Sequence, residues 1–137
     1  MAPSISESLS GFYAFLCYFG SSCLLLAVFC SVYLFVTPYP ELRLVREGKC
    51  APAISLGGAI LGFVIPLASA IAHSTSFMDM LVWAMVALVV QIVVFLILRW
   101  ILRGLVHDIA RDRIAPAIVV AVFSLAAGLL NAASMSW

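Results

Sequence analysis

The chain has few charged residues. Seven Lys or Arg and six Asp or Glu make up 9% of its 137 residues, whereas globular proteins carry about 25%. Hydrophobic residues account for 66% of the chain, and the mean hydropathy is +1.23. The longest stretch between apolar segments, residues 37–52, is too short to bury a core of its own. These shortages exclude a soluble domain and place any function in membrane helices, short loops or partners.

The N-terminal region lacks the features of a secretory signal. No Lys or Arg precedes Gly11, whereas a cleavable signal peptide begins with a basic region followed by a short apolar core. The first apolar run is also too long for such a core. We therefore expect this run to be a retained helix.

Buried charge and metal-binding patterns are missing as well. No Asp, Glu, Lys or Arg lies in the middle of an apolar segment, although ion and proton pathways usually need one there. The four cysteines form no Cys-x-x-Cys pair and have no zinc-type spacing. The basic loops also contain Glu and Asp, which suits lipid headgroups better than nucleic acid. We expect no metal, no cofactor, no nucleic-acid partner and no proton-coupled pump.

Four long apolar segments make up most of the chain. A helix needs about 20 apolar residues to span a bilayer core of about 30 Å. Helices are the expected form because lipid requires every backbone polar group to be paired locally. The sequence therefore predicts an all-α integral membrane protein with a single four-helix transmembrane domain over residues 1–137. The helices are expected at about 11–36, 53–73, 80–103 and 114–134.

The basic residues predict the orientation of these helices. All seven fall between the first and second helices, or at the end of the third and in the loop after it: Arg43, Arg46, Lys49, Arg99, Arg103, Arg111 and Arg113. With four spans these two regions share one face, which the positive-inside rule assigns to the cytoplasm. Both termini are then extracytoplasmic. Trp83 and Trp137 suit the outer interface and Trp100 the inner one.

The two basic loops end in similar sequences. Residues 49–54 read KCAPAI and residues 113–118 read RIAPAI, an offset of 64 that also pairs Leu61 with Leu125 and Ala68 with Ala132. Proline is favoured in the first turn of any helix, which is one explanation. The other is a duplicated two-helix hairpin, which would give two parallel-repeat hairpins.

The second apolar segment, GGAILGFVIPLASA over residues 57–70, contains a proline among glycines. One helix face carries Gly58, Gly62, Pro66 and Ala70, and the fourth segment has a similar ridge of Ser124, Gly128 and Ala132. Small residues at this spacing allow close helix approach in lipid. Gly62 also reduces crowding by the Pro66 ring. The pattern predicts either a tight packing seam or a bent helix that lines a binding site or path.

Few polar side chains lie inside the apolar segments. Gln91 is near the middle of the third segment, Asn131 lies in the fourth, and Ser69 flanks Pro66. Gln91 is expected to bridge to a neighbouring helix or subunit. If a path exists, these three side chains are its expected polar lining.

The outer loop contains the residue types of a hydrolase, namely His73, Ser74, Ser76 and Asp79. A catalytic triad needs an orienting fold and an oxyanion hole. A six-residue turn supplies neither, so we expect no catalytic residue here.

Residues 61–70, LGFVIPLASA, resemble the glycine-aromatic-x-Ile-Pro-Leu element of the YjfL-like inner-membrane proteins, domain of unknown function 350. Residues 128–137, GLLNAASMSW, are similar to that family's Asn-Ala-Ala and closing Trp, and Trp83-Ala84 followed by Gln91 also fits. The resemblance covers almost the whole chain. It implies a bacterial inner-membrane protein with four spans, whose termini are periplasmic on the orientation above. It implies no catalytic residues.

Three hypotheses follow. The first is a non-enzymatic membrane module in envelope maintenance, whose partners are the lipid bilayer and either further copies of itself or other membrane proteins. The alternative is a small oligomeric transporter or channel for an ion or small solute. A third, an intramembrane enzyme, would require Ser69 or His73 to be essential.

Overall fold

The computed structural model describes residues 4–37, 40–102 and 104–135. The described chain forms the helices α1 (Ile5–Val36), α2 (Glu41–Arg46), α3 (Cys50–His73), α4 (Phe77–Ile101), α5 (Leu105–Ala110) and α6 (Ile114–Ser134). Four of them, α1, α3, α4 and α6, are long and apolar enough to cross a membrane. The predicted all-α class with four apolar helices is confirmed. Arg103 and Trp137, used above to predict the orientation, lie outside the described residues.

Two helices begin before the apolar segments because serines cap them. The Ser4 hydroxyl accepts a hydrogen bond from the Glu7 N–H, and the Glu7 carboxylate accepts one from the Ser4 N–H at 3.0 Å. This reciprocal capping box pairs two N–H groups that would otherwise lack a partner. Ser76 caps α4 by accepting from the Asp79 N–H at 3.2 Å. Polar caps therefore start α1 six residues and α4 three residues earlier than hydrophobicity alone predicted.

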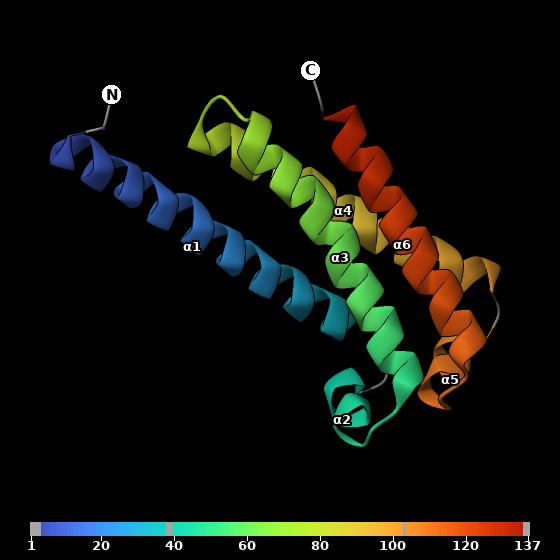
Figure 1. The fold of residues 1–137 in the computed structure, drawn as a ribbon. Helices are drawn as coiled ribbons and strands as arrows, with labels where there is room; N and C mark the ends of the chain where they lie inside the picture. The colour runs from blue at the N-terminus through green and yellow to red at the C-terminus, as the bar shows by residue number, and fades with distance from the viewer. Residues whose placement is uncertain (1–3, 38–39, 103, 136–137) are drawn as a thin grey trace.

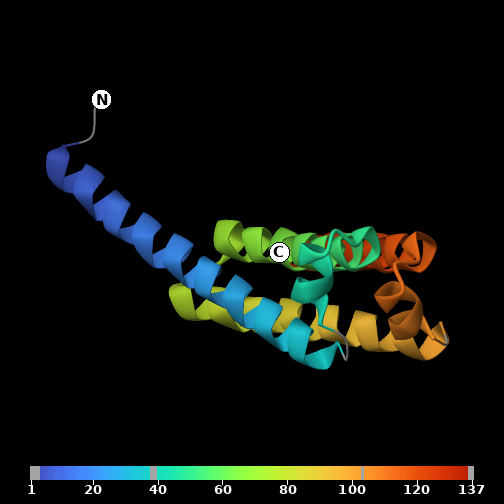
Figure 2. The same ribbon diagram turned by 90° about the horizontal axis from the view of Figure 1, so that it is seen from below.

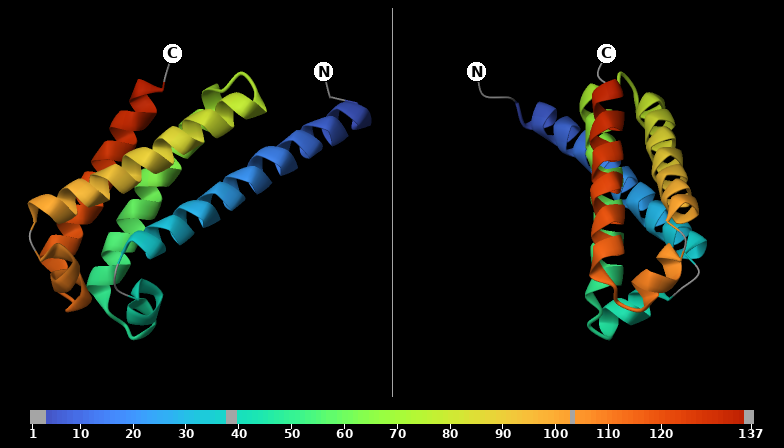
Figure 3. Two further views of the ribbon diagram at one scale, coloured as in Figure 1. Left: turned by 180° about the vertical axis from the view of Figure 1, so that it is seen from behind. Right: turned by 90° about the vertical axis from the view of Figure 1, so that its right-hand side faces the viewer.

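The helices α3, α4 and α6 form the packed centre of the molecule. Figures 1 and 2 show α3 and α6 side by side, with α4 crossing behind them. α1 joins this centre through its C-terminal half, where the Phe29 ring stacks on Phe63 at 4.6 Å and Tyr33 meets Phe95 edge-on at 5.2 Å. Its N-terminal half diverges from the bundle, as the two views of Figure 3 show. Phe29 and Tyr33 are the buried residues of α1 among those described.

The two short helices lie at one end of the bundle, opposite the start of α1 and the end of α6 (Figure 1). α2 and α5 both contain six residues, and each begins and ends 64 positions from the other. The turns after them have matching hydrogen bonds: the N–H groups of residues 47, 48 and 49 bond the carbonyls of 43, 45 and 44, and those of 111, 112 and 113 bond 107, 109 and 108. Gly48 and Asp112 both have positive φ, 85° and 63°. α3 and α6 also begin 64 residues apart.

Candidate functional site

Pro66 lies inside α3, which continues on both sides of it from Cys50 to His73. Proline has no N–H, so the carbonyl of Gly62 loses the partner that a regular helix would supply. Gln91 of α4 replaces this partner, because its amide Nε2 donates to the Gly62 carbonyl at 3.0 Å. The deficit that Pro66 creates in one helix is therefore satisfied by a side chain of another.

The same amide also reaches α6. Gln91 Nε2 donates to the Ser124 carbonyl at 3.0 Å, so one –NH₂ group joins α3, α4 and α6. The Gln91 side chain is 2% exposed. Its Oε1 is buried without a hydrogen-bond partner among the described residues. A buried acceptor left unpaired costs about 1–3 kcal/mol. The contact between the three helices therefore contains one hydrogen-bond acceptor, Gln91 Oε1, that is not satisfied by the described residues.

Glycines allow the backbones of α3 and α6 to come this close. A Cβ atom on Gly62 would overlap the Ser124 carbonyl oxygen and lie 2.9 Å from Gln91 Nε2. A Cβ on Gly128 would overlap the Gly62 carbonyl, and one on Gly58 would overlap Ala121. Any larger residue at these positions would force the helices apart and separate Gln91 from its two acceptors.

The structure brings the predicted small-residue ridges together within one chain. Gly58, Gly62, Pro66 and Ala70 are all buried on α3, as are Ser124 and Gly128 on α6. Ala132 is half-buried, and its carbonyl accepts a hydrogen bond from Ser69 Oγ at 3.3 Å. These positions are used inside the monomer and are not a free surface for another molecule.

Of the three polar residues predicted to line a path, two donate hydrogen bonds to backbone carbonyls and the third does not within the described part of the chain. Both N–H groups of Gln91 bond backbone carbonyls, and the Ser69 hydroxyl bonds the end of α6. Asn131 is half-buried, and its Nδ2 has no partner among the described residues. Sequence reasoning missed the two carbonyls that Gln91 binds. The spacing of Gly62 and Pro66 identifies one of them, since a proline four residues on always deprives that carbonyl of its partner.

Two further polar contacts were not predicted. The Tyr33 hydroxyl and the Ser55 hydroxyl are 3.1 Å apart in the buried contact between α1 and α3. Asp112 accepts a hydrogen bond from the Ala51 N–H at 2.8 Å, so the loop before α6 caps the start of α3. No short-range pattern points to either pair, because the partners are 22 and 61 residues apart.

Three of the four hydrolase-like residues in the loop between α3 and α4 bond neighbouring backbone groups, whereas the Ser74 hydroxyl is buried without a partner among the described residues. Ser76 caps α4, and the Asp79 carboxylate accepts from the Thr75 N–H at 3.2 Å. His73 Nδ1 lies 3.0 Å from the carbonyl of Ser69 and 3.4 Å from its hydroxyl. The carbonyl can only accept, so this contact requires a proton on Nδ1. An Nδ1 that carries a proton is no base for the Ser69 hydroxyl.

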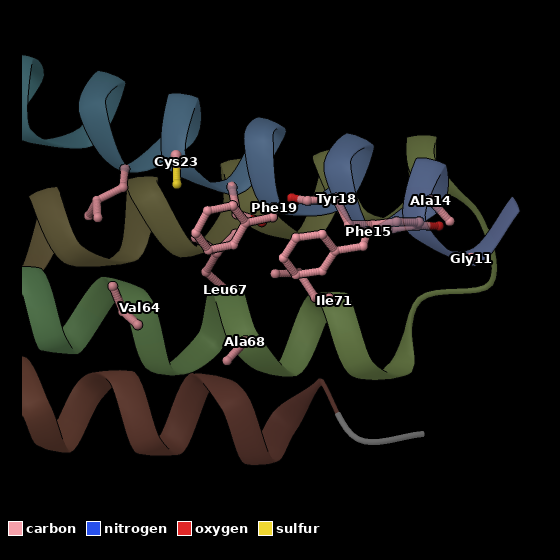
Figure 4. A pocket seen from close by; sticks show the side chains of 12 residues that line it. Gly11, Ala14, Phe15, Tyr18, Phe19, Cys23, Val64, Leu67, Ala68 and Ile71 are labelled. Carbon is pink, nitrogen blue, oxygen red and sulfur yellow. Dashed lines mark hydrogen bonds between the residues drawn. The ribbon is translucent and has the colours of Figure 1, made fainter. Parts of the chain in front are cut away.

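An open groove of about 580 Å³ separates the N-terminal half of α1 from α3. Figure 4 shows aromatic side chains of α1, among them Phe15 and Phe19, reaching towards α3. The lining comprises Gly11, Ala14, Phe15, Tyr18, Phe19, Ser22, Cys23 and Leu26 of α1 and Val64, Leu67, Ala68 and Ile71 of α3. The Ser22 hydroxyl donates to the Tyr18 carbonyl of its own helix. The groove therefore suits an apolar occupant.

The sequence matches the family described as Domain of Unknown Function (DUF350) over residues 7–135. The chain belongs to the DUF350 family. Two curated relatives, each named UPF0719 inner membrane protein YjfL, come from Escherichia coli strain K12 and Escherichia coli O157:H7. Both are 33% identical over 124 residues, which cover 90% of this chain and 94% of the relative. No solved structure matches the chain.

These matches confirm the resemblance read from the LGFVIPLASA element. The relatives' name places them in the inner membrane, and the four apolar helices make this DUF350 member a multi-pass membrane protein. The description of the family assigns no activity. The function must therefore be argued from the geometry of this chain.

Proposed function

We propose that this DUF350 protein is a non-enzymatic module of the bacterial inner membrane that associates with its own copies, or with other membrane proteins, in envelope maintenance. The observation that carries this proposal is the use of Gln91: the most buried polar side chain of α4 donates both amide hydrogens to helix backbones. A side chain committed in this way holds helices together and offers no donor to a ligand. Because the small-residue ridges are consumed in the same contact, association must use another surface.

We further propose that both termini are periplasmic and that two hairpins form a parallel repeat. The concentration of basic residues around α2 and α5 supports the orientation. The repeat is supported by the matched bounds of α2 and α5, the identical turn hydrogen bonds and the shared positive φ at Gly48 and Asp112. A favoured proline at the start of a helix accounts for none of these three matches. A C-terminal reporter that is active only in the cytoplasm should be silent.

The oligomeric state tests the proposed function. The protein is extracted directly into lipid nanodiscs without detergent, and its mass is measured by native mass spectrometry. We expect assemblies larger than the 14.7 kDa chain, either of this protein alone or with a second membrane protein. A lone monomer over the whole range of expression levels contradicts self- and partner-association alike.

A small transporter or channel is the second candidate. It is favoured by two polar atoms within the apolar helices that are buried without a partner among the described residues, Gln91 Oε1 and Asn131 Nδ2, since polar groups at membrane depth mark many transport paths. Proteoliposomes would be tested for flux of a panel of monovalent ions and small amines. The unmodified protein would be compared with Asn131→Leu and with empty liposomes. Flux that falls to the empty-liposome level in this variant supports transport, and equal flux with and without the protein removes it.

A further inference from the structure

The first hairpin consists of α1–α3 and the second of α4–α6, so α3 and α6 are equivalent helices. They contact each other through opposite faces. α3 contacts α6 with the side that carries Gly58 and Gly62, here called its front. α6 contacts α3 with Ser124 and Gly128. At the offset of 64, the α3 positions equivalent to these are two residues further along than Gly58 and Gly62. Two residues turn a helix by about 200°, so α6 contributes its back.

Because the front of one helix meets the back of the other, the two hairpins are related by a sideways displacement in the plane of the membrane. They are not related by a two-fold axis. In a two-fold pair the same face of each helix would meet. A sideways displacement instead leaves two helix faces without a partner in the described chain, the front of α6 and the back of α3. The unused front of α6 carries Val122, Ala126 and Leu130, which are all exposed. These residues stand 64 positions after Gly58, Gly62 and Pro66.

The unused back of α3 borders the open groove beside α1. Val64 and Ala68 line this groove, and their equivalents in the second hairpin are Gly128 and Ala132. Both equivalents contact α3, Gly128 through Gly62 and Ala132 through the hydroxyl of Ser69. The back of α6 in the second hairpin is therefore covered by α3. The equivalent back of α3 in the first hairpin is covered by no helix among the described residues and borders the groove. The α1–α3 groove is the vacant counterpart of a groove that is filled by a helix.

We propose that α6 of a second copy seats in the α1–α3 groove, with Val122, Ala126 and Leu130 against Val64 and Ala68. This continues the α3–α6 contact from one chain to the next, with both copies in the same membrane orientation. The proposal rests on the self-association proposed above and specifies its surface. Because the contact joins different faces, it extends into rows or closes into rings. Val122 and Ala126 replace glycines, so the helices lie further apart than α3 and α6.

Cross-linking in native membranes tests this contact. Cys23 lines the groove and is a free thiol. In a variant whose other three cysteines are changed to serine, Ala126→Cys adds a thiol to the front of α6. We expect oxidation with copper phenanthroline to give a ladder of dimers, trimers and larger species. Val89→Cys, on the exposed side of α4, is the matched control and should give none.

The pattern of products separates the possible interfaces. In a head-to-tail contact, Cys23 of one copy faces the Ala126→Cys thiol of the next. A variant that keeps only one of these two thiols should therefore form no cross-linked product on oxidation. Efficient dimers through the Ala126→Cys thiol alone would indicate a two-fold contact and overturn the proposal. Absence of a ladder in the two-thiol variant would also overturn it, and this is the result expected if a lipid acyl chain fills the groove.

Native mass spectrometry of the unmodified protein in nanodiscs distinguishes this failure from that of the proposed function. Assemblies without the ladder would leave self-association standing and reject this surface. A monomer would reject both. Ala126 is exposed, so Ala126→Trp adds bulk on the lipid-facing side and is expected to leave the fold unchanged. It should shift the protein to smaller assemblies, whereas Val89→Trp should leave their size unchanged, and equal sizes for both variants count against the groove.

Discussion

The α3–α6 contact and the N-terminal half of α1 are both rich in apolar side chains, but they differ in how closely they meet other helices. On α3, a Cβ atom at Gly58 or Gly62 would overlap the neighbouring helix, whereas a Cβ at Gly11 or Gly20 of α1 would have no atom of another described helix within 4 Å. Lipid is as apolar as a leucine side chain, so hydrophobicity alone does not drive helices together in a membrane. The difference shows that close backbone approach and a hydrogen-bonded amide, rather than apolar content, determine which helices pack.

The largest expected effect comes from filling the closest contact. Gly62→Leu would place side-chain atoms on the Ser124 carbonyl, and we expect it to destabilise the fold by about 3 kcal/mol, the upper end of the usual cost of overpacking. Gly20→Leu meets open surroundings and replaces a poor helix former, so it should not destabilise the fold and should raise its stability by up to about 1 kcal/mol. Unfolding of the purified protein in mixed micelles of increasing denaturing-detergent content measures both. Equal losses for the two variants would break the comparison between α3 and α1.

The next effect concerns the amide that joins the three helices. Gln91→Leu removes two hydrogen bonds, worth about 0.6 and at most about 1.7 kcal/mol each, and also removes the unpaired Oε1, so we expect a net loss of no more than about 1–2 kcal/mol. Pro66→Ala restores an N–H for the Gly62 carbonyl. In that background Gln91→Leu should therefore cost less, by roughly 0.6 kcal/mol. The same unfolding assay on the double-mutant cycle tests this, and strictly additive losses would mean that Gln91 does not compensate for the proline.

The smallest effect tests how α1 is attached. Tyr33→Phe removes the hydroxyl that meets Ser55, and we expect a loss of about 0.6 kcal/mol. Tyr13→Phe is the matched control, because Tyr13 is 71% exposed on the divergent half of the same helix. A difference in unfolding free energy between the two variants supports attachment through the C-terminal half. If Tyr13→Phe costs as much, the Tyr33 hydroxyl contributes nothing specific to the attachment of α1.

Sequence reasoning reached the helices because their signals are local. Apolar length predicted four of them, but it missed the caps at Ser4 and Ser76, which required polar residues outside the apolar runs to be read as helix starts. The ridges of Gly62 and Gly128 were recognised from their spacing. Their mutual contact was not predicted, because spacing along one helix does not say which other helix it meets.

The sequence by itself determined that the chain lives in a membrane, that it is helical, and that Pro66 leaves the Gly62 carbonyl without a helical partner. These conclusions depend on composition, run length and covalent structure. The tertiary structure alone decided that Gln91 supplies the missing bond, that α3 and α6 meet front to back, and that half of α1 stands away. Each of these depends on the relative rotation and position of separate helices, which small differences in close packing settle and which no local pattern encodes.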